Sequence, residues 1–82
     1  MSSKYPPLTA KQVRRGLKAL GFTKREAKSG TSHEHWVKIE GNRIYKVTVD
    51  APKEPFTQDL ITSMASQAGV SKKKFYAACL GK

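Results

Sequence analysis

The chain has 82 residues and a formal net charge of +10, because 16 Lys and Arg residues stand against 6 Asp and Glu residues. This length supplies apolar residues for one hydrophobic core, so we expect a single domain over residues 1–82. No apolar run reaches the roughly 20 residues that a membrane-spanning helix needs, and Met1 to Tyr5 lacks the apolar stretch of a secretory signal. A basic excess of this size is typical of proteins that bind a polyanion such as a nucleic acid.

The cysteine content and the character of the first predicted helix indicate the cellular compartment of this protein. Cys79 is the only cysteine, which excludes an internal disulfide and favours a reducing compartment. We expect no membrane partner, since the first predicted helix lacks the aromatic-rich apolar face of a membrane-surface helix. The sequence therefore predicts a cytoplasmic protein.

The first predicted helix runs from Ala10 to Leu20. Thr9 and Gln12 have the spacing of a capping box, in which each side chain bonds the backbone N–H of the other residue. Gly21 follows the helix, where a left-handed residue often ends one. The apolar positions recur at helical spacing, at Val13, Leu17 and Leu20.

Three antiparallel strands are predicted after this helix. Phe22 to Lys28 has the short, mixed pattern of an edge strand, and Ser29 to Ser32 forms a polar turn. His33 to Glu40 and Arg43 to Val49 are joined by Gly41-Asn42, a pair of turn residues that predicts a hairpin. Because side chains alternate along a strand, one face holds His33, His35, Val37 and Ile39, and the other holds Glu34, Trp36, Lys38 and Glu40.

Two helices are predicted to complete the chain. The prolines in Asp50 to Phe56 exclude regular strand pairing, so this segment is a connecting loop whose Phe56 folds back on the core. Thr57 is the N-cap of a helix that Gly69 closes, with an apolar face of Leu60, Ile61, Met64, Ala65 and Ala68. Ser71 caps a short last helix anchored by Phe75 and Leu80. The order α-β-β-β-α plus a closing helix predicts an α+β fold, a three-stranded antiparallel sheet with helices on one face.

Two groups of cations are candidates for contact with phosphates. The outer face of the first helix carries Lys11, Arg14, Arg15 and Lys18, which repel one another, and we expect no acidic residue to relieve them. We predict that this face binds RNA; the alternative is a solvated charged face. Lys72, Lys73 and Lys74 crowd the start of the last helix, where the partial positive charge of the helix end is unfavourable for cations. A phosphate, an acidic partner or solvent alone would relieve that cluster.

The potential metal ligands in the sequence are too few and too scattered to predict a metal site. His33, His35 and Cys79 are the only nitrogen or sulfur ligands, and the six acidic residues are scattered singly, so we expect no metal and no cofactor. RNA carries its own nucleophile, the 2′-hydroxyl, and then needs only proton transfer and charge stabilisation from a protein.

His33 is the candidate for that proton transfer. It would take the proton of the 2′-hydroxyl, while Lys28, Lys38 or Lys46 would stabilise the negative charge of the phosphorane. The alternative for His33 is a strand histidine that packs against the helices or caps the preceding turn, and His35 is expected to have that structural role. Trp36 is expected to pack in the sheet, with stacking on an unpaired base as the alternative.

Four short segments of the chain, taken together in their order and spacing, resemble those of a known protein family. They are Leu17 to Phe22, Gly30 to His33, Lys46 to Val49, and Gln67 to Ser71 followed by Phe75. In this order the chain resembles the HicA toxins, the ribonuclease half of HicA-HicB toxin-antitoxin pairs, over nearly its whole length. The histidine of the family's Gly-Ser-His motif maps onto His33, although Thr31 stands here between the glycine and the serine.

The resemblance implies a fold of the double-stranded RNA-binding type and a translation-blocking mRNA endonuclease activity. It also implies a HicB-like antitoxin partner, whose acidic groups would match the +10 charge. We therefore expect a type II toxin, a metal-independent mRNA endoribonuclease with His33 as general acid or base. The alternative is a non-catalytic double-stranded RNA-binding module that uses the same basic helix, and an adaptor for a protein partner is a third class.

Overall fold

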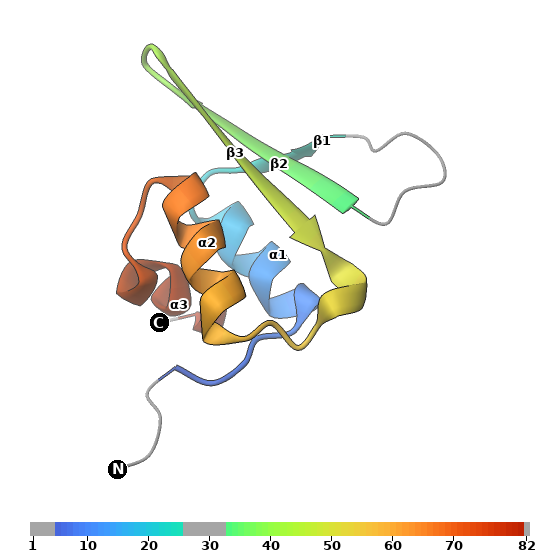
Figure 1. Ribbon diagram of the computed structural model, residues 1–82. Helices are drawn as coiled ribbons and strands as arrows, with labels where there is room; N and C mark the ends of the chain where they lie inside the picture. Colours follow the sequence, from blue (N-terminus) through green and yellow to red (C-terminus); the bar gives the residue numbers. More distant parts are fainter. Residues whose placement is uncertain (1–4, 26–32, 82) are drawn as a thin grey trace.

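The computed structural model describes residues 5–25 and 33–81 of the chain. It contains helix α1 (Ala10–Ala19), strands β1 (Thr23–Arg25), β2 (His33–Glu40) and β3 (Arg43–Asp50), the 3₁₀ helix η1 (Ala51–Lys53), and helices α2 (Gln58–Ala68) and α3 (Lys72–Leu80). The strands form an antiparallel sheet in the order β1-β2-β3, and the helices lie on one side of it (Figure 1). This is the α+β fold that the sequence predicts.

The ends of the helices follow the predicted caps. Thr9 and Gln12 form the capping box: the Gln12 N–H donates to Thr9 Oγ1 at 3.2 Å and the Thr9 N–H donates to Gln12 Oε1 at 2.9 Å. Helix α2 ends at Gly69, whose φ of +74° lies in the left-handed region. Ser71 Oγ accepts a hydrogen bond from the Lys74 N–H and so begins α3.

Strand β1 begins one residue later than predicted. Among the described residues Thr23–Arg25 pairs with β2, and Phe22, the predicted first residue, is instead buried in the core at 3% exposed. Residues 26–28 of the predicted strand lie outside the described part of the chain. The short edge strand leaves the end of β2 that runs toward the hairpin without a partner on that side among the described residues.

The hairpin of β2 and β3 has the predicted turn. Gly41 has a φ of +60° at the first central position, as a type II′ turn requires. The register runs without interruption from Glu40 opposite Arg43 to His33 opposite Asp50. Strand β3 thus extends one residue beyond the predicted end at Val49, and this extension places a carboxylate opposite the candidate histidine.

The hydrophobic core lies between the sheet and the helices. The sheet contributes its inward-facing Trp36, Val47 and Val49, which are buried. Phe56 folds back on this core as predicted, and its backbone exchanges hydrogen bonds of 2.7 and 3.2 Å with that of Leu8. The helices supply most of the other buried residues, including Val13, Leu17, Ile61, Met64, Ala65, Phe75, Tyr76 and Cys79.

The C-terminal helix is anchored differently from the prediction. Phe75 is buried as expected, but Leu80 is only half-buried at the edge of the core. Tyr76 and Cys79 are buried in its place, and the Tyr76 hydroxyl donates to the carbonyl of Pro6 at 2.9 Å. Helix α3 therefore packs against α1 along the side that carries Cys79.

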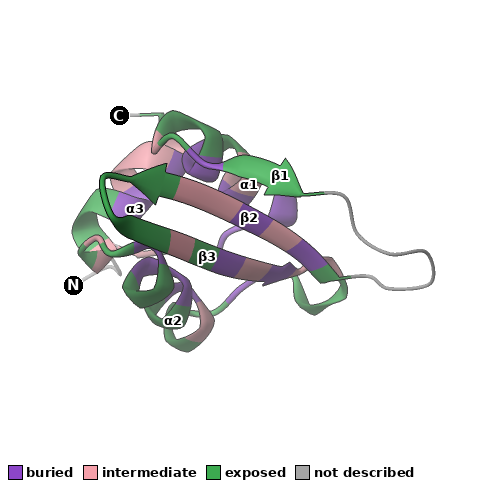
Figure 2. Ribbon diagram, turned by 90° about the horizontal axis from the view of Figure 1, so that it is seen from above, coloured by how far each residue is buried: buried purple, intermediate pink, exposed green. Residues whose placement is uncertain are grey.

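The other face of the sheet is open, and Figure 2 looks down on it. Ile39 and Ile44, which are partners across the hairpin, are 72% and 70% exposed. His33, His35, Val37 and Ile39 share this face, as the alternation of side chains predicts. No helix in the described part of the chain is long and apolar enough to cross a membrane.

Candidate functional site

His33 lies at the start of β2, directly opposite Asp50 at the end of β3. Its side chain is 51% exposed, and its Nε2 atom is 3.5 Å from Asp50 Oδ2. Lys53 follows Asp50 by one turn of η1, which brings Lys53 Nζ to 4.0 Å from the same carboxylate oxygen. An imidazole, a carboxylate and an ammonium group therefore meet at this corner of the sheet.

The three groups stand at one end of a groove between β3 and α2. The groove has a volume of about 240 Å³. Its other lining residues are Thr48, Phe56, Leu60, Ser63, Met64 and Gln67. Gln67 Oε1 accepts a hydrogen bond of 3.2 Å from the Thr48 N–H, which ties α2 to the outer edge of β3. A ligand in this groove would lie within reach of the His33 ring.

Sequence reasoning missed two members of this corner. Asp50 was within reach of prediction, because counting outward from the Gly41-Asn42 turn places it opposite His33. Lys53 was not, because it reaches the carboxylate only through the 3₁₀ turn that follows the strand. The prolines of this segment predict a loop and do not indicate its shape.

The lysines that were predicted to assist His33 are placed elsewhere. Lys38 lies on the face of the sheet opposite to His33, with its Nζ 6.0 Å from the centre of the Phe22 ring and 3.7 Å from Glu40 Oε2. Lys46 shares the open face but pairs with Val37, roughly 13 Å along the strand from Asp50. Lys28 lies outside the described residues. Of the described lysines, Lys53 is the one that forms an ion pair at this corner.

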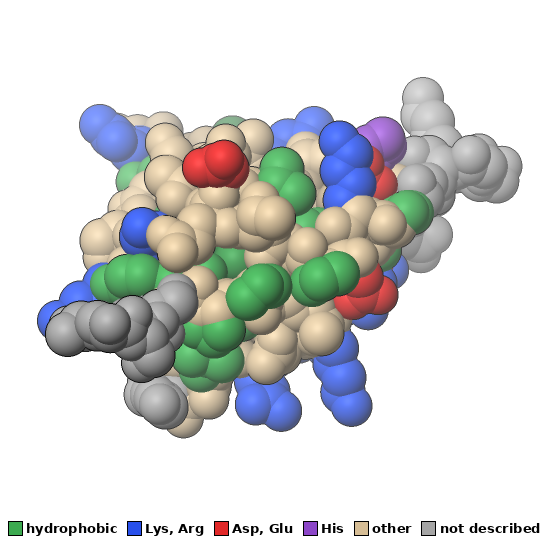
Figure 3. Space-filling model, turned by 60° about the horizontal axis from the view of Figure 1, so that its bottom comes forward, with side chains coloured by type: hydrophobic (Ala, Val, Ile, Leu, Met, Phe, Trp, Pro, Cys, Tyr) green, Lys and Arg blue, Asp and Glu red, His purple; other side chains and the backbone are tan. Residues whose placement is uncertain are grey.

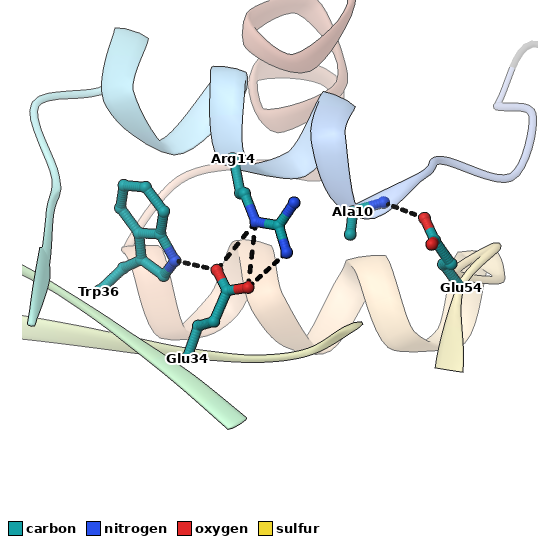
Figure 4. A network of polar contacts seen from close by, with 5 residues as sticks. All are labelled: Ala10, Arg14, Glu34, Trp36 and Glu54. Atoms are coloured by element: carbon teal, nitrogen blue, oxygen red, sulfur yellow. Dashed lines mark hydrogen bonds and ion pairs between the residues drawn. The ribbon is translucent and has the colours of Figure 1, made fainter. Parts of the chain in front are cut away.

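Arg14 of α1 is paired with Glu34 of β2, as Figure 4 shows. Arg14 Nε lies 3.0 Å from each carboxylate oxygen of Glu34, and Nη2 also donates to Oε2. The indole N–H of Trp36 donates to Glu34 Oε1 at 3.2 Å. The expectation that no acidic residue relieves the α1 cations is therefore wrong at Arg14, because the carboxylate comes from another element.

The same contacts decide the role of Trp36. The residue is 1% exposed, and both its ring and its N–H are engaged inside the protein. Stacking on an unpaired base is thus excluded, and the predicted packing role is confirmed.

The Arg14 guanidinium holds the pKa of the Glu34 carboxyl below its ordinary value, mainly through their hydrogen bonds. Burial of the carboxylate acts in the opposite direction, and the bond from Trp36 lowers the pKa further. Because the folded protein has the lower pKa, this pair stabilises the fold above the unfolded pKa, near 4.5, and the contribution is lost as the pH falls through the lowered value.

Replacing Glu34 with glutamine is expected to lower the free energy of unfolding by about 1 to 2 kcal/mol at pH 7, because a charge-assisted bond becomes a neutral one. The Arg14 side chain is 39% exposed, so the loss is smaller than for a fully buried pair. Urea denaturation of both proteins between pH 7 and pH 3 measures it. The difference between the two should shrink as the pH falls below 4.5, and a difference that stays constant would contradict the assigned role of the ion pair.

A second groove lies on the opposite edge of the sheet, between α1 and β1. Its volume is about 500 Å³, and Arg14, Lys18 and Lys24 stand around a floor of Phe22 and Trp36. Lys24 was not among the predicted binding residues, although it belongs to the same basic surface. Lys11 and Arg15 are exposed on α1 and do not line this groove.

His35 lies on the open face of the sheet and not against the helices, as its predicted packing role would need. Its Nδ1 atom is 3.4 Å from Thr48 Oγ1 across the hairpin. It also lines a shallow depression of about 290 Å³ with Arg25, Val37, Ile44 and Lys46. His35 and His33 therefore share a face but have different polar neighbours.

The lysine cluster of α3 is partly engaged within the protein. Lys72 Nζ donates to Gln58 Oε1 at 3.2 Å and lies 4.6 Å from the centre of the Tyr5 ring. One of the three lysines is thus held by the fold itself and needs no phosphate or acidic partner to offset its charge.

Comparison with protein-family models, curated proteins and solved structures finds no match for this chain. Within residues 5–25 and 33–81, no three His, Cys, Asp or Glu side chains are grouped so that they could hold a metal ion. Function is therefore inferred from the residues of the two grooves.

Proposed function

We propose that this protein is a metal-independent endoribonuclease that cleaves mRNA, the HicA-like toxin of a type II toxin-antitoxin pair. The observation that carries the proposal is the corner at His33. A half-exposed imidazole stands there beside a carboxylate and an ammonium group, at the end of a groove, in a protein of net charge +10. These are the groups that metal-free cleavage of RNA requires.

In this reaction His33 accepts the proton of the 2′-hydroxyl as its oxygen attacks the adjacent phosphorus. The bond between phosphorus and the 5′-oxygen breaks, and the proton returns to that oxygen. The products are one end with a 2′,3′-cyclic phosphate and one with a 5′-hydroxyl. Lys53 stabilises the negative charge that grows on the phosphoryl oxygens, and Asp50 orients the imidazole from the opposite strand.

The cations outside this corner hold the rest of the RNA. Lys18 and Lys24 in the groove at the β1 edge contact phosphates, with Lys11 and Arg15 extending the basic surface along α1. Arg14 already pairs with Glu34, so its main contribution is to shape this groove. Lys46 contacts the RNA backbone on the open face of the sheet. An acidic HicB-like antitoxin in the cytoplasm would compete with RNA for these cations.

The test is cleavage of a long RNA by the purified protein in EDTA. We expect cleavage to continue, with fragments that end in a 2′,3′-cyclic phosphate and begin with a 5′-hydroxyl. The basic groove alone would serve a non-catalytic RNA-binding module equally well. RNA that is bound in a salt-dependent manner but stays intact would therefore establish that module and reject the enzyme.

A further inference from the structure

The groove between β3 and α2 has two chemically different halves. The half at the corner of the sheet carries His33, Asp50 and Lys53, which are suited to the phosphate at which the proposed cleavage takes place. The other lining residues are uncharged and form what we call the uncharged half of the groove: Thr48, Ser63 and Gln67 are polar and at least partly exposed, whereas Phe56 and Met64 are buried and Leu60 is partly buried.

Helix α2, which forms one wall, contains no Lys or Arg, and its only charged residue is Asp59 in the first turn. Figure 3 shows a face on which uncharged side chains cover the middle and most basic side chains stand at the rim. In a chain with 16 cations, an uncharged wall beside the candidate site is a local exception. A second phosphate would find no counter-charge there.

We propose that the uncharged half of the groove binds one unpaired nucleobase, that of a nucleotide next to the phosphate held at His33. This inference rests on the proposed function. A nucleobase has apolar faces and a polar edge, which match the apolar side chains and the hydroxyl and amide groups of this half. The volume of about 240 Å³ for the whole groove is large enough for a single base beside a phosphate.

Gln67 is the residue that would recognise the edge of this base. Its Oε1 atom accepts from the Thr48 N–H, and a backbone N–H can only donate, so the orientation of the amide is fixed. The amide NH₂ group is then the donor that Gln67 offers to a ligand. A base that presents a carbonyl or ring-nitrogen acceptor at this position would be preferred.

The change Gln67→Glu tests this role with little change in shape. Glutamate keeps an oxygen for the Thr48 N–H but replaces the donating NH₂ with a second acceptor. We expect the wild-type protein to prefer particular bases at one position beside the cut in a randomised single-stranded RNA. The Gln67→Glu protein should lose about tenfold in that preference, the factor that corresponds to one hydrogen bond.

Gln58→Glu is the matched control, because it adds the same charge to the same helix. Its side chain accepts from Lys72 at the other end of α2, outside the groove, and the change keeps that acceptor. Preference is a ratio measured within each protein, so a general loss of rate from the added negative charge cancels. The control should therefore retain the wild-type preference.

A second change covers the case that Gln67→Glu disturbs the edge of the sheet. Ser63→Leu fills the uncharged half from an exposed position on α2 and should also remove the preference. If the wild type cleaves without base preference, or if both groove variants keep the wild-type preference, the base site is wrong while the nuclease stands. If the wild type does not cleave at all, the proposed function fails and the base site fails with it.

Discussion

Replacing His33 with alanine is expected to lower the rate of RNA cleavage by about 10² to 10⁴-fold, the range that a positioned general acid or base contributes. The imidazole is half-exposed at the corner of the sheet, and its removal leaves Asp50 and Lys53 in place. RNA binding should therefore persist while cleavage is lost. Single-turnover cleavage of a labelled RNA in EDTA, together with a binding titration at the same salt concentration, measures both quantities.

His35→Ala is the control for this change. The two histidines are two positions apart on β2 and share the open face, so each variant removes one imidazole from the same strand and surface. His35 Nδ1 lies near Thr48 Oγ1, and among the described residues no carboxylate forms an ion pair with His35 as Asp50 does with His33. Equal losses in the two variants would show that general binding by the face, and not proton transfer by His33, limits cleavage.

The fold follows from local signals that agree with one another. The Thr9 and Gln12 capping box, the Gly41 turn and the Gly69 helix end each specify backbone geometry within a few residues. The strand β2 was predicted with its observed bounds because its neighbours in sequence form a clean hairpin. The start of β1 was not, since burial of Phe22 depends on the packing of the helices and not on the strand pattern.

Only the residues of the site that lie on paired strands could be predicted from the sequence, because the strand register fixes their positions. His33 and its face follow from alternation, and its pairing with Asp50 follows from the turn. Arg14 and Glu34 are 20 positions apart in sequence and lie on different elements, so no helical spacing indicates their pairing. Lys38 is a wrongly predicted neighbour of His33. It is close to His33 in sequence, but it lies on the other face of the sheet.

The two grooves divide the work of the proposed nuclease between the two edges of the sheet. Lys18 and Lys24 stand at the β1 edge, whereas His33 and the uncharged wall of α2 stand at the β3 edge. Phosphates bound at the first edge contribute affinity without sequence information, and a base bound at the second contributes selectivity. Raising the salt concentration should therefore weaken binding more than it changes the position of cleavage.

Gly16 of α1 is the residue where the smallest possible change should destabilise the protein strongly. It is buried against α3, and an added Cβ atom would lie 2.9 Å from the backbone N and Cα atoms of Cys79, as well as against the Cys79 thiol. A backbone clash is not relieved by a side-chain rotation, so the two helices must move apart. Burial raises the pKa of the Cys79 thiol to about 12, although a hydrogen bond with the Gly16 backbone acts in the opposite direction, so the thiol stays uncharged in the core.

We expect Gly16→Ala to lower the free energy of unfolding by about 2 to 3 kcal/mol, as overpacked cores do. In an exposed helix the same change stabilises by about 1 kcal/mol, because alanine has the higher helix propensity. The exposed Ala19 of the same helix provides the reverse control, since Ala19→Gly should cost about 1 kcal/mol through propensity alone. Urea denaturation of the three proteins would contradict the close packing of α1 on α3 if Gly16→Ala proved more stable than the wild type.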